Sequence, residues 1–143
     1  MAGITATADV DIEAPAGRVW RALTDPEEIS QYFFGTKVDT DWKPGSRIVW
    51  QGEWEGKKYE DKGEVLEVEP ERLLSMTHYS PMTGQPDVPE SYHTLTFRLS
   101  GSDGGTHVEL TQDNNADDAE AERSATNWRT MLDGLKRTAE AGS

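Results

Sequence analysis

The sequence predicts an α+β fold in which a curved antiparallel sheet of six to seven strands wraps around a long C-terminal helix. One observation is an apolar stripe at helical period near the end of the chain, formed by Ala121, Ala125, Trp128, Leu132, Leu135 and Ala139. The other is the alternation of polar and apolar residues in most of the preceding chain, which is the period of half-buried strands. A helix with one apolar face needs an apolar partner, and this sheet would provide it.

The long helix is predicted over 117–141. Asp117 and Glu120 occupy the N-cap and N3 positions of a capping box, and Gly142 is placed to end the helix. One flank beside Trp128 carries mainly small or polar residues: Ser124, Asn127, Met131, Gly134 and Thr138. That flank either leaves room for a cavity between helix and sheet or allows close backbone packing, and the sequence leaves both alternatives open.

The chain before the main run of strands predicts one strand and two short helices. Residues Ile4–Ile12 alternate and are expected to form the first strand. Pro15 starts a helix with Trp20 on its buried face, and Pro26 starts a second helix that carries Tyr32 and Phe33. We expect the two helices to form a V that supports the far end of the long helix.

A meander of strands is then expected. Leu66 and Val68 are predicted to lie on one face of their strand, and Trp42 is expected in a loop rather than against a ligand. Met76, His78, His93 and Gln112 are predicted to point inward from later strands. The expected strands cover residues 36–40, 46–52, 59–68, 72–79, 91–99 and 106–114.

Composition limits the classes of function. The 143 residues fit a single domain spanning 1–143, and a net charge of −13 disfavours nucleic acid and anionic membrane surfaces as partners. The lack of Cys removes disulfides and thiolate metal sites and fits a reducing compartment. With neither a signal peptide nor a run of about 18 apolar residues, a cytoplasmic protein is expected.

The inward histidines are the main candidates for a site. His78 and His93 come close if their strands pair in register, and Gln112 would join them from the last strand. They would be polar anchors in an apolar pocket, or core histidines that other protein groups satisfy. Two histidines with no third ligand do not predict a metal site, so no metal and no other cofactor are expected. The predicted ligand-binding residues are Trp20, Tyr32, Phe33, Trp50, Met76, His78, His93, Gln112, Asn127, Trp128 and Met131.

Several stretches resemble a known family. They are Ala14–Pro26 (APAGRVWRALTDP), Lys43–Ser46 (KPGS), Gly63–Pro70 (GEVLEVEP) and Asn127–Trp128. These stretches resemble domains similar to the C-terminal part of the activator of Hsp90 ATPase, within the START and Bet v 1-like superfamily. The resemblance implies a helix-grip fold. The stretch 80–93 further resembles the signature of a bacterial subgroup, although Ser91 stands where Asn is expected.

Three functions follow as expectations. The first is a protein that holds a small apolar or amphipathic molecule between sheet and helix. The second, implied by the resemblance, is an Hsp90-associated co-chaperone or stress-response interaction protein. For the chain in general, a monomer is expected or a homodimer that pairs through exposed strand edges. The third is a cyclase or hydrolase in the same cavity, with His93 and either Glu90 or Asp113 as acid–base groups. Because the sequence contains no nucleophile motif, no catalytic residue is assigned and a non-enzymatic role is favoured.

Overall fold

The structure, a computed structural model, describes residues 4–32, 35–54, 56–80, 86–102 and 104–141. One antiparallel sheet has the strand order β1-β7-β6-β5-β4-β3-β2. Its seven strands are β1 (Ile4–Ile12), β2 (Lys37–Asp39), β3 (Arg47–Trp54), β4 (Lys57–Glu69), β5 (Leu73–His78), β6 (His93–Ser102) and β7 (Gly105–Asn115). The helices are α1 (Ala16–Thr24), α2 (Pro26–Tyr32) and α3 (Asp118–Ala141), with a short 3₁₀ turn, η2 (Pro89–Ser91), before β6. The predicted α+β class is confirmed.

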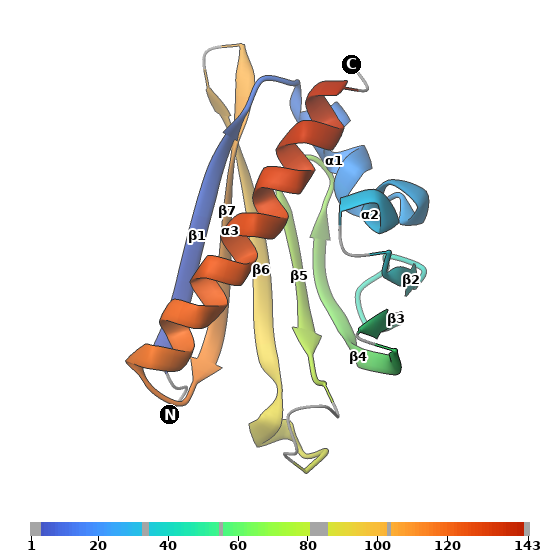
Figure 1. Cartoon of the computed structure of the whole chain (residues 1–143). Coiled ribbons are helices and arrows are strands. Elements are labelled where there is room, and N and C mark those ends of the chain that lie inside the picture. Colours follow the sequence, from blue (N-terminus) through green and yellow to red (C-terminus); the bar gives the residue numbers. More distant parts are fainter. Residues whose placement is uncertain (1–3, 33–34, 55, 81–85, 103, 142–143) are drawn as a thin grey trace.

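Helix α3 runs diagonally across one face of the sheet, and α1 and α2 lie beside its C-terminal half (Figure 1). Arg18 in α1 links all three helices. Its Nη2 donates a hydrogen bond to the Thr138 carbonyl oxygen at 3.0 Å, and its Nη1 lies 2.6 Å from Glu28 Oε1 in α2. The predicted support of the far end of α3 is therefore confirmed. None of the helices in the described part of the chain is long and apolar enough to cross a membrane.

The start of α3 is fixed by its predicted cap. The Glu120 backbone N–H donates to Asp117 Oδ1 at 2.8 Å, and Glu120 Oε2 accepts from the Ala116 N–H at 3.2 Å. The return hydrogen bond thus reaches one residue further back than in a standard capping box. Both bonds satisfy backbone donors at the helix start, where intrahelical partners are missing.

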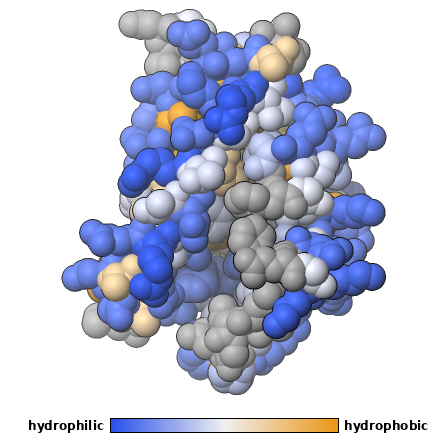
Figure 2. Space-filling view, viewed as in Figure 1, coloured by the Kyte–Doolittle hydropathy of each residue, from blue (hydrophilic) through white to orange (hydrophobic). Residues whose placement is uncertain are grey.

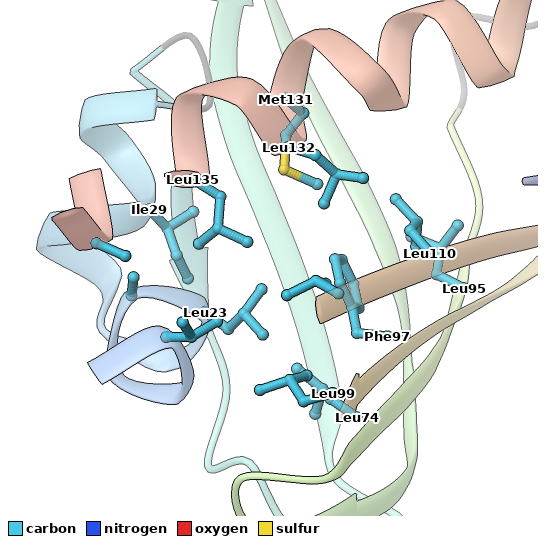
Figure 3. Packing of buried hydrophobic residues seen from close by; sticks show 14 of the residues in the cluster. Leu23, Ile29, Leu74, Leu95, Phe97, Leu99, Leu110, Met131, Leu132 and Leu135 are labelled. Carbon is cyan, nitrogen blue, oxygen red and sulfur yellow. The ribbon is translucent and has the colours of Figure 1, made fainter. Parts of the chain in front are cut away.

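The core fills the space between α3, the helix pair and the sheet. Figure 3 shows Met131, Leu132 and Leu135 of α3 on one side of this space, with side chains of the sheet opposite them. Hydrophilic residues cover most of the face seen in Figure 2, which has the orientation of Figure 1. The largest buried apolar side chains, each less than 2 % exposed, are Ile12, Ile48, Leu74, Leu110, Leu132, Leu135, Val19, Val65 and Val108.

Strand β4 differs from its prediction at one residue step. Its pairing with β5 shifts register between Val65 and Glu67, which marks a β-bulge. Val65 is fully buried, whereas Leu66 is 37 % exposed. The prediction that Leu66 and Val68 lie on one face is therefore wrong. Because a bulge reverses the alternation on one side of it, the odd-numbered residues before it face inward, including Asp61.

The small flank of α3 divides into two parts. A Cβ on Gly134 would lie 2.8 Å from Tyr32 Cβ, so the helix approaches α2 closely at this point. Tyr32 is fixed there, because its hydroxyl donates to the Ala22 carbonyl oxygen at 2.8 Å. Burial, with a contribution from the Glu28 charge, raises the pKa of the Tyr32 phenol. Close packing thus holds at Gly134, whereas Ser124 and Asn127 border open space.

Candidate ligand-binding cavity

A cavity of about 490 Å³ lies between the N-terminal half of α3 and the inner face of the sheet. This volume falls within the range of about 300–1,000 Å³ that is typical of small-molecule sites. Its wall is mainly aliphatic and aromatic. The apolar lining residues are Leu23, Ile29, Tyr32, Val38, Trp42, Trp50, Tyr59, Leu74, Met76, Leu95, Phe97, Trp128 and Met131.

Most of the predicted ligand-binding residues lie at this wall. They are Tyr32, Trp50, Met76, His78, Gln112, Asn127, Trp128 and Met131. Phe33 lies outside the described residues. Trp20 is not part of the wall, because its half-buried indole packs against the hydrophobic core from α1. A ligand contact at Trp20 stays a prediction.

His93 is also absent from the described wall, although the predicted pairing of the strands is confirmed. His78 and His93 are direct partners across β5 and β6. His93 Nδ1, however, lies 2.8 Å from the backbone carbonyl oxygen of Asp113. Strand β7 is irregular at this point, with a φ of +59° at Asn114, and a ladder carbonyl is therefore available to the imidazole. His93 therefore fits the alternative of a core histidine whose hydrogen bond is made with another protein group.

His78 does line the cavity, and two side chains hold its ring. Its Nε2 lies 2.9 Å from Asp61 Oδ2, and the exposed fractions of the two side chains are 19 % and 15 %. The Trp50 ring stands edge-on to the imidazole, with 5.0 Å between centroids and an interplanar angle of 68°. Asp61 Oδ1 and His78 Nδ1 are buried and have no hydrogen-bond partner among the described residues.

Other polar side chains of the wall are occupied with one another. The Trp128 indole N–H donates to Gln112 Oε1 at 2.9 Å, and this bond ties α3 to β7. Thr36 Oγ1 and the Tyr59 hydroxyl share a hydrogen bond of 2.6 Å. Gln112 thus positions Trp128 in the wall, which differs from the predicted role as a ligand anchor.

Sequence reasoning missed several members of the wall. The bulge explains why Tyr59 and Asp61 were missed. Alternation counted back from Leu66 and Val68 places both side chains on the outer face of the sheet, whereas they line the cavity. Alternation counted back from Val65 places the side chains of both residues on the inner face. Trp42 lies in the loop between β2 and β3, as predicted, with a φ of +56°, and its side chain lines the cavity. Among the residues with described positions, no three His, Cys, Asp or Glu side chains group as metal ligands.

Comparison with protein families adds to this geometry. Residues 13–140 match the family described as activator of Hsp90 ATPase homolog 1-like protein, here AHSA1. The chain belongs to this family. AHSA1 membership supports a ligand-binding fold in general and specifies no ligand. Among curated proteins, none matches this AHSA1 chain.

Solved structures agree with the AHSA1 assignment. The solution structure of ChR145 from Cytophaga hutchinsonii is 48 % identical, with a TM-score of 0.86 over 99 % of this chain and 97 % of that one. The Aha1 dimer from Colwellia psychrerythraea is 19 % identical, with a TM-score of 0.76 over 98 % of each chain. DynU16, from the dynemicin biosynthetic locus, is 21 % identical, with a TM-score of 0.79 over 97 % of this chain and 48 % of that one. The last two show likeness of fold alone.

Proposed function

We propose that this AHSA1 chain binds a small apolar or amphipathic molecule in the cavity between α3 and the sheet. The observation that carries the proposal is the apolar wall around about 490 Å³ of space, built from both layers of the fold. Elsewhere the two layers pack without exposure, as Leu132, Leu135 and Ala139 are 0 % exposed. Because unfilled apolar space costs stability, a cavity confined to one half of the interface supports the presence of an occupant.

The other predicted functions stay predictions. An Hsp90-type partner rests on family resemblance and a homodimer on pairing of exposed strand edges. A pull-down with the host chaperone and a sedimentation measurement would test them. Cyclase or hydrolase activity loses its predicted acid–base residue, since His93 does not reach the described cavity wall. Cytoplasmic location stays a prediction from the lack of Cys in the sequence.

Binding of an uncharged fluorescent probe tests the proposal. N-phenylnaphthylamine emits strongly only in apolar surroundings, and Trp42, Trp50 and Trp128 in the wall provide energy-transfer donors. We expect saturable binding of one dye per chain with quenching of the tryptophan emission. A linear, non-saturating increase in dye emission would contradict the proposal.

A pair of helix variants locates the dye. Thr130 is exposed at the cavity rim, and Thr130→Trp would place an indole at the entrance. Its neighbour Arg129 is also exposed but does not line the cavity, so Arg129→Trp is the matched control. We expect about tenfold weaker dye binding in Thr130→Trp, a loss of about 1.4 kcal/mol, and unchanged binding in Arg129→Trp. Equal binding by both variants would place the dye elsewhere and overturn the proposal.

A further inference from the structure

The charge of the cavity wall is unbalanced toward the negative. Among the described residues it carries one carboxylate, Asp61, beside His78, and it carries neither Lys nor Arg. All 14 Lys and Arg residues of the chain lie in its described part, so none is left to complete the wall. An anionic ligand would therefore be desolvated next to a carboxylate without a cation to pair with, which is unfavourable.

The cation closest to Asp61 in sequence does not change this balance. Lys62 follows Asp61 in β4, and successive residues of a strand point to opposite faces. Lys62 Nζ forms an ion pair with Asp87 Oδ2, outside the cavity. The Asp87 carboxylate also accepts a hydrogen bond of 2.6 Å from the Tyr92 hydroxyl. Lys62 therefore belongs to a separate cluster with Asp87 and Tyr92, near the start of η2.

Among the described side chains that line the cavity, the buried polar atoms without a hydrogen-bond partner are Asp61 Oδ1 and His78 Nδ1. The Asp61 carboxylate can only accept hydrogen bonds, and its Oδ2 accepts one from His78 Nε2. Asp61 Oδ1 is a second acceptor without a partner. Buried polar atoms are nearly always satisfied by protein, water or ligand. The groups at Asp61 and His78 therefore suit a partner that donates hydrogen bonds.

We infer that the cavity selects apolar molecules that carry an uncharged or cationic, hydrogen-bond-donating head group, a hydroxyl or an amine, which binds at Asp61 and His78. Molecules with a carboxylate, sulfonate or phosphate head are excluded. This inference rests on the proposed function, because it names the ligand class for the same cavity. The remaining lining then holds the apolar body of the ligand between Trp50, Met76 and Trp128.

Two matched dyes test the charge selection. N-phenylnaphthylamine and its sulfonated analogue, anilinonaphthalene sulfonate, share one skeleton and differ by a single negative charge. We expect the uncharged dye to bind at least about tenfold more tightly, because like charges in a low-dielectric site repel strongly. Equal or tighter binding of the sulfonate would overturn the inference while leaving the proposed function intact. Saturable binding of neither dye would overturn both.

Two isosteric substitutions test the role of Asp61. Asp61→Asn keeps an oxygen acceptor for His78 Nε2 but removes the charge. Glu60→Gln removes the same unit of charge from the neighbouring exposed residue, which pairs with Gln51 and does not line the cavity. We expect Asp61→Asn to tighten binding of the sulfonated dye about tenfold and Glu60→Gln to leave it within about twofold. An equal response of both variants would show a general charge effect and contradict the inference.

Naphthol and its methyl ether test the need for a donor. The two molecules have the same apolar body, but only naphthol can donate a hydrogen bond. We expect naphthol to displace N-phenylnaphthylamine at about tenfold lower concentration than the ether. In His78→Phe and Asp61→Leu variants whose folding is verified by thermal unfolding, this preference should disappear. Equal displacement by the two compounds in the wild-type chain would contradict the donor requirement.

Discussion

The two halves of α3 differ in how closely they pack against the rest of the protein. In the C-terminal half, Leu132, Leu135 and Ala139 are fully buried, and Gly134 brings the helix against Tyr32 of α2. In the N-terminal half, Ser124 and Asn127 face a cavity, which extends to Met131 at the middle of the helix. The apolar stripe has the same helical spacing in both halves. The difference comes from the partners, because α1 and α2 lie beside the C-terminal half (Figure 1).

This contrast shows how one helix can supply both stability and a binding site. The packed half closes the core around α1, α2 and the sheet, so the other half does not have to pack completely. At the cavity, the hydrogen bond from Trp128 to Gln112 ties α3 to β7. We therefore expect substitutions in the packed half to affect mainly folding and those at the cavity to affect mainly ligand binding.

The largest expected difference is between two truncations in α3. Leu135→Ala in the packed half should lower the free energy of unfolding by about 3–4 kcal/mol, since it opens a new cavity in a filled core. Met131→Ala should cost about 1–2 kcal/mol, because Met131 already borders empty space and loses fewer contacts. Urea unfolding of both variants measures the difference. Equal costs would contradict the division of the helix into two halves.

A pair of glycine substitutions sharpens the comparison. Gly134→Ala should destabilise the protein by about 1–2 kcal/mol, because its Cβ would lie 2.8 Å from Tyr32 Cβ and 3.3 Å from the Tyr32 carbonyl oxygen. Gly17→Ala in α1 is the control. Its Cβ would meet only the Glu71 carboxyl group at 3.7 Å, so helix propensity should stabilise by about 0.5–1 kcal/mol. Stabilisation by both alanines, measured by thermal unfolding, would mean that α3 does not approach α2 this closely.

The smallest effect concerns the sheet below the packed half. His107 Nδ1 lies 2.7 Å from Asp11 Oδ1 across β7 and β1, and this hydrogen bond, aided by the Asp9 charge, raises the pKa of His107. A raised folded-state pKa adds stability below the ordinary histidine pKa of about 6.5, and this contribution is lost as the pH rises through the raised value. His107→Gln should therefore lower the melting temperature slightly at about pH 5.5 and leave it unchanged at about pH 9. An equal shift at both pH values would indicate a packing effect instead.

The fold was predictable because its signals are periodic and local. Alternation in β6 and β7 and the stripe of α3 each encode which face is buried, and the cap at Asp117 marks where α3 begins. Strand Ile4–Ile12 was placed at its observed bounds for the same reason. These features require no knowledge of distant parts of the chain.

The cavity was only partly predictable because its wall depends on breaks in those patterns. The bulge after Val65 turned Asp61 inward, and the irregularity at Asn114 gave His93 a backbone partner in place of the cavity. Gly134 and Asn127 share one flank of the helix, yet one packs and the other borders the cavity, since only Gly134 meets α2. Single-residue shifts of this kind leave no periodic signal in the sequence.

Intermolecular nuclear Overhauser effects between bound N-phenylnaphthylamine and labelled methyl groups test the central claim most directly. The account predicts contacts from the dye to the methyl groups of Met76, Leu95 and Met131, which line the cavity. It predicts no contacts to Leu66, which is exposed and lies outside the cavity. Contacts confined to Leu66 or other surface methyl groups, with none to Met76 and Met131 at saturating dye, would contradict a binding site between α3 and the sheet.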